Sequence, residues 1–348
     1  MSDKNITIYD IAEEAQVSPS TVSRVLTGSA NVSRVKKDKI EKLISKYNFQ
    51  PNALARSLIK KETKTIGFIL PDITNPFFST VFLEAEKQAL NMGYTMILCN
   101  SMNDNILNVT NIESLYLKTL SEKQVDGIIF MGGRINESKT NEEYAKEINE
   151  ILQKIPIVMI NGKMTGVDCI KVRTNEKEGI HNLVKYLHEL GHQKIGFIGG
   201  IKGITSADDK IKAFTKAIDQ FGITCKKEWI INSCFSIEDG YASMEQLLKN
   251  DDLPTAIMAV NDFVAIGAIR AAETNGKKVP EDISITGFDG VYLTDIIRPK
   301  ITTVSQNCAV LGATAMDVML AILRGKKYKK ETIIKSNLLI KDSCKSLI

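Results

Sequence analysis

The first residues with recognisable chemistry lie in one short helical pattern near the N-terminus. Ser18 can cap this helix, Pro19 suits its first position, and Val22 lies on its apolar side. The exposed side and the start of the helix carry small polar side chains and one arginine that can fork onto a guanine, namely Ser20, Thr21 and Arg24. A helix N-terminus also attracts phosphate. The pattern predicts a DNA-reading helix, with a protein–protein module as the alternative.

Two further helical patterns support this segment. Thr7 and Asp10 have the spacing of a capping box at the start of an apolar stripe that spans residues 8–15. A third pattern begins after Ser33. Two short helices joined by a tight turn and supported by a third form a helix-turn-helix. We therefore expect an all-α head over residues 1–49.

The charge distribution agrees with a polyanion as partner. The chain of 348 residues has a formal net charge of +4 at pH 7. Residues 1–61 contain eight Lys and three Arg against six acidic residues, so the excess positive charge lies in this piece and the remainder is close to neutral. A cationic piece on a near-neutral body favours nucleic acid as the partner, with plain solvated surface as the alternative.

From Ile66 onwards, short apolar strands alternate with amphipathic helical patterns, which is typical of parallel sheets with right-handed crossovers. The length of this region suits two α/β lobes with a cleft between them better than one open sheet, and a TIM barrel is the rival fold. We expect strands at 66–70, 95–99, 127–131, 155–160, 194–198, 256–260, 283–287 and 301–304, and helices at 82–92, 179–190, 210–221 and 263–275.

Polar and aromatic side chains follow several of these strands. Parallel strands bind ligands at their carboxyl ends, so these side chains should converge. Carboxylates and amides beside aromatic rings suit a polar, ring-shaped ligand, and a helix cap or a core position is the alternative role for each residue. The candidate ligand-binding residues are Asp72, Asn75, Phe77, Phe78, Asn261, Asp289 and Gln306.

In combination, these motifs resemble the lac repressor family. Residues 7–12, 17–18 and 21–26 look like the DNA-binding head of that family. Residues 31–33 and 51–58 look like its third helix and its hinge helix, and the resemblance spans the whole chain. It implies a homodimer, with a dimer contact in the helix at 82–92, that binds a near-palindromic double-stranded DNA operator. It also implies a small-molecule effector, a sugar or a sugar acid, bound between the lobes.

The resemblance also assigns residues to the operator. In the family, the hinge segment folds when a dimer meets DNA, and a leucine from each chain enters the minor groove. Leu58 matches that leucine and Ala55 lies beside it, although Leu58 could instead cover the linker. The DNA-binding residues implied are Thr7, Ser18, Pro19, Ser20, Thr21, Ser23, Arg24, Asn31, Asn52, Ala55, Arg56 and Leu58.

Two positions depart from the family pattern. Lys210 stands where most members place an arginine that grips the ligand, and Asn161 stands where many carry an aspartate. The loss of an acid and the retention of a cation shift the expected site towards positive charge. This change favours an anionic ligand such as a sugar acid over a neutral sugar, with a solvated Lys210 as the alternative.

The expected fold is therefore an all-α helix-turn-helix head plus an α/β bilobed core of two parallel-sheet, Rossmann-like lobes, similar to periplasmic binding proteins. The expected parts are the head at 1–49, a hinge helix and linker at 50–61, and the core at 62–348. Within the core, lobe one is expected at about 62–161 and 291–323, and lobe two at about 162–290 and 324–348.

The remaining patterns exclude other classes. The sequence contains no Walker run, no Gly-x-Ser-x-Gly elbow and no metal-type spacing around its histidines, so we expect no enzyme, no cofactor and no metal. No stretch approaches the about 18 apolar residues of a membrane span, and the six widely spaced cysteines suit a reducing cytoplasm. The rival functions are a solute-binding receptor of the periplasmic type and a sugar-processing α/β enzyme. Inducer against corepressor and dimer against tetramer both stay open.

Overall fold

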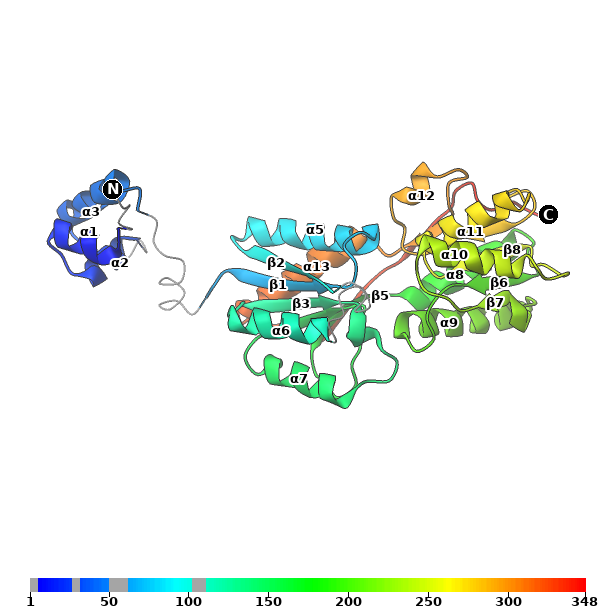
Figure 1. Ribbon diagram of the computed structural model, residues 1–348, viewed down its shortest axis with the longest axis horizontal. Helices are drawn as coiled ribbons and strands as arrows, with labels where there is room; N and C mark the ends of the chain where they lie inside the picture. Colours follow the sequence, from blue (N-terminus) through cyan, green and yellow to red (C-terminus); the bar gives the residue numbers. More distant parts are fainter. Residues whose placement is uncertain (1–5, 27–31, 50–61, 102–110) are drawn as a thin grey trace. The chain divides into compact units, whose positions relative to one another are not determined.

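The computed structural model describes residues 6–26, 32–49, 62–101 and 111–348. The chain divides into two compact units, residues 1–63 and residues 64–348 (Figure 1). Among the described residues, no helix is both long enough and apolar enough to cross a membrane.

The first unit has the three helices that the sequence predicts, α1 (Ile8–Ala15), α2 (Pro19–Leu26) and α3 (Arg34–Lys46). The capping box of Thr7 and Asp10 is present at the start of α1, and Gln16 ends this helix in the left-handed conformation. Ile11, Val22 and Ile40, one from each helix, are fully buried against one another in a small core. The helix-turn-helix expected from the sequence is therefore confirmed.

The second unit contains two parallel sheets, each covered by helices on both faces. We call the larger sheet and its helices lobe one. Its strands lie in the order β11-β5-β4-β3-β1-β2, with α5 and α13 on one face and α6 and α7 on the other (Figure 1). The elements are β1 (Thr65–Leu70), α5 (Pro76–Asn91), β2 (Thr95–Asn100), α6 (Ile112–Glu122), β3 (Gly127–Met131), α7 (Glu142–Leu152), β4 (Ile157–Ile160), β5 (Ile170–Thr174), α13 (Cys308–Leu323) and β11 (Glu331–Ile334).

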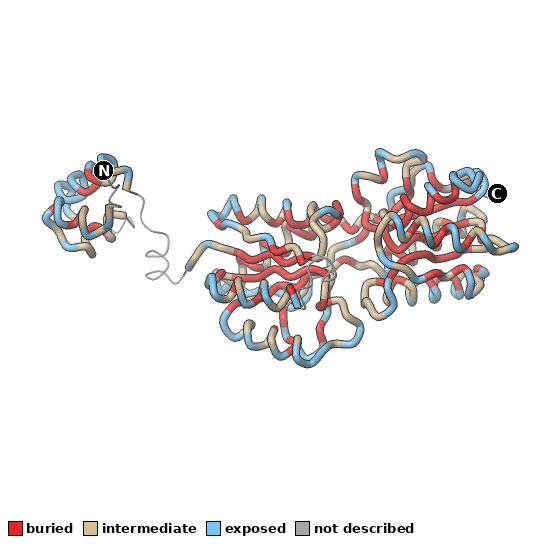
Figure 2. The backbone as a smooth tube through the Cα atoms, in the orientation of Figure 1, coloured by how far each residue is buried: buried red, intermediate tan, exposed pale blue. Residues whose placement is uncertain are grey.

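Lobe two is the four-stranded sheet of order β7-β6-β8-β9 with helices α8 to α11. Its strands β6 and β8 are buried along their whole length, and Figure 2 shows the red of buried residues along the sheet. The elements are α8 (Glu176–Glu189), β6 (Ile195–Ile198), α9 (Thr205–Phe221), β7 (Ile230–Ile231), α10 (Ile237–Leu247), β8 (Ala256–Ala259), α11 (Asp262–Thr274) and β9 (Ser284–Thr286).

The chain passes between the lobes at several points. It leaves β5 of lobe one and enters α8 of lobe two directly. It returns from β9 through α12 (Leu293–Ile296) and β10 (Thr303–Ser305) into α13 of lobe one. After β11 it turns back through β12 (Asn337–Leu339), which pairs antiparallel with β10. These crossings bring the ends of β4, β5 and β10 together.

Several expectations about elements need correction. The lobe boundaries expected at 161/162 and 323/324 are wrong, because β5 and β11 lie beyond them and still pair in the lobe-one sheet. The strand expected at 301–304 is β10, which pairs antiparallel with β12 instead of joining a parallel sheet. The sequence reading also missed α6, α7, α10 and α13 and the strands β5, β7, β11 and β12.

One close helix contact in lobe one depends on a glycine. Gly312 in α13 packs against the Val81 carbonyl oxygen in α5, where an added Cβ would overlap that oxygen. Both helices cover the same face of the sheet, so neither can move away without opening the core beneath them.

We therefore expect Gly312→Ala to lower the free energy of unfolding by about 1–3 kcal/mol, the usual range for overpacking. Urea unfolding followed by circular dichroism measures this change. Asp317→Ala, at an exposed position of the same helix, is the control and should have little effect. Equal stability of Gly312→Ala and the wild type would show that α5 and α13 are not packed this closely.

Candidate functional site

The second helix of the head presents the polar side that the sequence predicts. Val22 is buried, whereas Ser18, Ser20 and Arg24 are exposed and Thr21 and Ser23 are half-buried. The Ser18 hydroxyl lies 2.9 Å from the Thr21 hydroxyl and accepts a hydrogen bond from the Thr21 backbone N–H at 3.3 Å. Pro19 opens the helix, so the side chains at its N-terminus are held in place by local capping.

Of the other candidates for DNA contact, one caps a helix and the rest lie outside the described residues. The exposed Thr7 donates its hydroxyl hydrogen to Asp10 at 2.6 Å within the capping box. The remaining predicted positions lie outside the described residues: Asn31, Asn52, Ala55, Arg56 and Leu58.

The third helix adds positive charge to the same unit. Arg34, Lys36, Lys39 and Lys42 are exposed along α3. Lys46 is bound to Glu14 of α1 at 2.8 Å, and the hydrogen bond to Glu14 raises the pKa of Lys46. This ion pair fixes α3 on α1, and the exposed basic side chains stay available for phosphates.

In lobe one, the predicted run after β1 forms a local turn. Asp72 accepts hydrogen bonds from the Thr74 backbone N–H at 2.9 Å and from its hydroxyl at 2.6 Å. Asn75 is buried and caps α5 by accepting from the Phe77 N–H at 3.0 Å. Phe77 belongs to the core, and Phe78 packs beside it edge to face, with ring centroids 5.1 Å apart. Asp72 thus stabilises the local turn and Asn75 caps α5, so both polar side chains have structural partners near them in the sequence.

The residues at the carboxyl ends of β4 and β10 do meet. Asn161 of lobe one donates its amide N–H to Gln306 Oε1 at 2.9 Å, and Thr174 at the end of β5 donates its hydroxyl to the same oxygen. Gln306 in turn donates Nε2–H to Asp289 Oδ1 at 2.7 Å. Asp289 follows β9 of lobe two, so the Gln306 amide joins the two lobes through one hydrogen-bonded chain.

Lys210 extends this chain inside lobe two. Its ammonium is buried, 3.4 Å from Glu176 Oε1 and 3.8 Å from Asp289 Oδ1. It also donates to the Val260 carbonyl oxygen at 3.1 Å and lies 4.0 Å from the Phe288 ring centroid. The Lys210 ammonium is therefore buried beside two carboxylates and is not the solvated side chain that the sequence left as the alternative.

Asn261 and Asp262 hold the neighbouring part of lobe two. Asn261 caps α11 by accepting from Val264 N–H at 2.8 Å and donates to the Phe235 carbonyl oxygen at 3.0 Å. Asp262 is buried and accepts from Val291 N–H at 2.8 Å and from the Thr303 hydroxyl at 2.6 Å.

Burial dominates the acid–base behaviour of the two buried aspartates. Burial and, secondly, the nearby Asp289 charge together raise the pKa of Asp262 to about 8, against the lowering effect of the hydrogen bonds that it accepts. Burial also raises the pKa of Asp289 to about 6, against the lowering effect of the Lys210 ammonium and the Gln306 hydrogen bond. We call the group of polar side chains around Lys210, Asp289 and Gln306 the polar centre of the core. It therefore contains two carboxyl groups whose pKa values lie near neutral pH.

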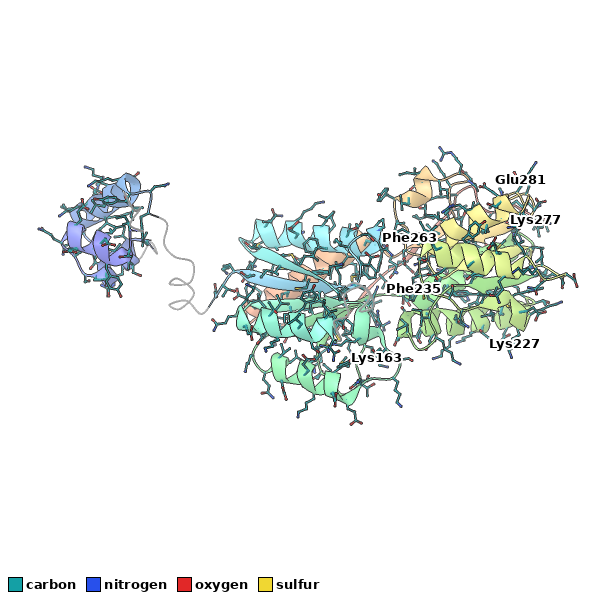
Figure 3. All side chains as sticks on the ribbon, viewed as in Figure 1. Lys163, Lys227, Phe235, Phe263, Lys277 and Glu281 are labelled. Atoms are coloured by element: carbon teal, nitrogen blue, oxygen red, sulfur yellow. The ribbon has the colours of Figure 1, made fainter. Side chains whose placement is uncertain are left out.

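The lobes also meet at a second place, away from the Gln306 chain. Ser138 N–H donates to the Gly203 carbonyl oxygen at 2.8 Å, and Glu137 and Ile204 form an antiparallel bridge. Gly203 and Ile204 directly precede α9, which carries Lys210. Figure 3 shows the labelled Phe235 and Phe263 at the side of lobe two that faces lobe one.

Sequence reasoning missed several groups of this centre. Glu176 and Thr174 were not among the candidates, because Lys171 and Arg173 interrupt the apolar pattern before them. Asp262 was not among them either, although it follows an apolar segment as Asp289 does. Phe288 sits beside Asp289 and could have been found as the aromatic partner of a nearby cation. Two shallow surface grooves lie elsewhere, one along α7 beside Thr165 and one beside β7, and neither is lined by a predicted ligand residue.

The chain is similar to known regulators along its whole length. Residues 7–52 match the model of the lacI family of bacterial regulatory proteins, and residues 184–344 match a periplasmic binding protein-like domain. A transcriptional repressor PurR of Mannheimia succiniciproducens is 33% identical over 345 residues, which are 98% of this chain and 99% of the relative.

Two solved structures show the same fold. A lac repressor dimer bound to operator and an anti-inducer has a TM-score of 0.86 at 23% identity, covering 98% of this chain and 100% of that one. A regulator from Enterococcus faecium with bound ribose has a TM-score of 0.70 at 30% identity, covering 82% of this chain and 100% of that one. The expected head and bilobed core are confirmed.

The donor and acceptor pattern around Gln306 can be tested at Asn161. In Asn161→Asp, an ionised carboxylate would place an oxygen against Gln306 Oε1 in place of a donor. We expect the free energy of unfolding to fall by about 1–3 kcal/mol at pH 8. The new carboxyl can donate when protonated, so its folded pKa is raised, and stability should return as the pH falls towards 5.

Urea unfolding at pH 5 and pH 8 measures this difference. Asn232→Asp, at an exposed position, is the control and should change stability little at either pH. A loss of the same size at both pH values would contradict the assignment of Asn161 as the donor.

Proposed function

The chain belongs to the lacI family of bacterial regulatory proteins, and from this membership we propose that it represses transcription at a near-palindromic operator. It acts as a cytoplasmic homodimer, catalyses no reaction, and changes its operator affinity when a small polar effector binds the core. The observation that carries the proposal is α2, a capped helix with one buried side and one exposed polar side in a cationic head.

The head supports sequence-specific reading of a duplex. The exposed Arg24 can make two hydrogen bonds to a guanine edge in the major groove, and Ser20 and Thr21 at the helix N-terminus can reach bases or phosphates. The exposed basic residues of α3 provide phosphate contacts that position the head without reading sequence. A two-fold dimer carries two such heads, so its target has two related half-sites.

Exposed apolar side chains on α5 support the homodimer. Leu83 is 50% exposed and Leu90 is 62% exposed on this helix, within the segment 82–92 that the sequence assigned to the dimer contact. Tyr292, just before the short helix α12, and Ile296 within it are 62% and 65% exposed. Exposed apolar side chains of this kind favour burial against a second copy.

The polar centre supports a ligand rich in hydroxyl groups. Asn161, Asp289 and Gln306 bring amides and a carboxylate together, and such groups recognise hydroxyls in both donor and acceptor roles. The relative from Enterococcus faecium was solved with ribose. Because Lys210 is already neutralised by Glu176 and Asp289, the centre favours a neutral sugar over a sugar acid.

The same contacts provide a route from effector to operator. An effector changes operator affinity only if it binds the operator-competent and operator-incompetent forms of the core with different affinity, and the coupling is reciprocal. The Gln306 chain and the Ser138–Gly203 contact join the lobes, so a ligand that rearranges them changes the angle between the lobes. That angle sets the separation of the two heads in a dimer.

DNA reading can be tested at Arg24. Arg24→Ala should weaken binding to a duplex selected by the wild-type protein from a random pool by about 1–3 kcal/mol, the value of one bidentate base contact. Binding to random competitor should change much less. Mobility shift over a range of salt concentrations measures both affinities.

Arg270→Ala is the matched control, since Arg270 is an exposed arginine of lobe two. Failure of the wild-type protein to prefer any duplex over random competitor would overturn the proposed function. Unchanged preference in Arg24→Ala would remove only Arg24 from the reading surface.

The dimer can be tested with charged substitutions on α5. Leu90→Glu should weaken self-association by at least about tenfold, or about 1.4 kcal/mol, because it places a charge on the apolar contact in both copies. Sedimentation velocity at several concentrations measures the change. Leu115→Glu is the control, because Leu115 is 50% exposed on α6, which covers the opposite face of the sheet. A Leu90→Glu variant as dimeric as Leu115→Glu would contradict the assigned contact.

A further inference from the structure

The Lys210 ammonium is held by groups of the protein itself. It donates a hydrogen bond to the Val260 carbonyl oxygen at 3.1 Å and forms ion pairs with Glu176 at 3.4 Å and Asp289 at 3.8 Å. The Phe288 ring covers it at 4.0 Å. The charge of the ammonium is therefore directed at two carboxylates of the protein. Lys210 is 5% exposed, which also separates it from solvent.

The charges around Lys210 do not balance. Glu176 of α8, Asp289 after β9 and Asp262 of α11 contribute three carboxyl groups, and Lys210 of α9 is the cation that the described contacts place among them. On the side of α13, Cys308 carries no charge near neutral pH because burial raises the pKa of its thiol to about 12. Gln306 is neutral. Among these groups, the Lys210 ammonium lowers the pKa of Asp289 and so favours its ionised form.

An ionised Asp289 can only accept hydrogen bonds, so it restricts the chain of hydrogen bonds between the lobes to one direction. Gln306 Nε2 donates to Asp289 Oδ1 at 2.7 Å. Its Oε1 then faces lobe one, where it accepts from Asn161 and Thr174. A protonated Asp289 that donates its proton would favour the flipped amide, which places the Gln306 NH2 group against the Asn161 NH2 group. Two donors would then face each other and the contact between the lobes would be lost.

We propose that Lys210 is a positioning residue that keeps Asp289 ionised, and that it thereby fixes the orientation of the Gln306 amide and the contact between the lobes. The role as a grip for the ligand, which its place in the sequence suggested, is replaced by that of an internal counter-ion. This inference deepens the proposed function, since it concerns the contact that the effector would control. Its test needs neither effector nor operator.

The experiment follows the stability of the full chain against pH from 4 to 9, by urea unfolding with fluorescence of Trp229. This residue is the only tryptophan of the sequence and is fully buried in lobe two. The folded pKa of Asp289 is above its ordinary value, so its contribution to stability is present at low pH and is lost as the pH rises through the folded pKa, about 6. In Lys210→Met, the loss of the cation should raise the folded pKa of Asp289. The pH at which stability declines should therefore rise by about 1–3 units.

Three further variants make the result specific. Lys210→Arg keeps the cation and should restore the pH of the wild-type decline, even if its absolute stability differs. Glu176→Gln removes a negative neighbour of Asp289 and should move the decline downwards, opposite to Lys210→Met. Lys216→Met, at an exposed position of α9, should leave the profile unchanged.

The double variant Lys210→Met with Asp289→Asn assigns the titrating group. It should lose the decline that Lys210→Met shifts, while any contribution from Asp262 stays. A Lys210→Met profile equal to that of the wild type would overturn the proposal, and so would a shifted decline that survives in the double variant. If Lys210→Met does not fold, an unshifted or upward-shifted decline in Glu176→Gln overturns it. None of these outcomes alters DNA binding by the wild-type head, so failure of this inference is distinct from failure of the proposed function.

Discussion

The amide of Gln306 is the group on which the arrangement of the core depends. It is almost fully buried, and both of its ends are used, the oxygen by lobe one and the nitrogen by lobe two. A buried amide with one wrong neighbour loses much of the energy of its hydrogen bonds, so the two lobes must present matched acceptors and donors at the same time. The Gln306 amide therefore joins the lobes only in an arrangement that satisfies both of its ends.

The head could be derived from the sequence almost completely, because its signals are local. The capping box of Thr7 and Asp10, Ser18 with Pro19, and the apolar stripe through Ile11 each specify their own helix. Most of the central strands were found for a similar reason, since β1, β3 and β8 are apolar and buried on both faces. The missed strands lack this signal. β5 carries Lys171 and Arg173, β7 has two residues, and β11 alternates between exposed and half-buried positions at the edge of its sheet.

The residues of the site were predicted more successfully than their arrangement in space. Asn161, Asp289 and Gln306 were chosen because they follow strands, and parallel strands do bring them together. Asp72 and Asn75 were chosen on the same ground, yet their oxygens are satisfied within their own turn, which is the local competition that such residues commonly enter. The residues next to each candidate in the sequence do not tell a convergent site from a local turn. The difference depends on which lobe the following segment of the chain enters. The wrong boundaries around β5 and β11 have the same origin.

Lys210 shows how a single replacement can change a role while it keeps a charge. An arginine has a rigid planar fork that matches a ligand carboxylate or a pair of hydroxyls, and it reaches outward to do so. A lysine has a compact ammonium on a flexible stem, and this group fits a small cage of a carbonyl oxygen, two carboxylates and an aromatic face. Once that cage is filled, the excess of carboxyl groups and not the cation sets the character of the site. The sequence predicts a positive charge at Lys210 but not the Glu176 carboxylate beside it. Only the packing of α8 against α9 brings these two side chains together.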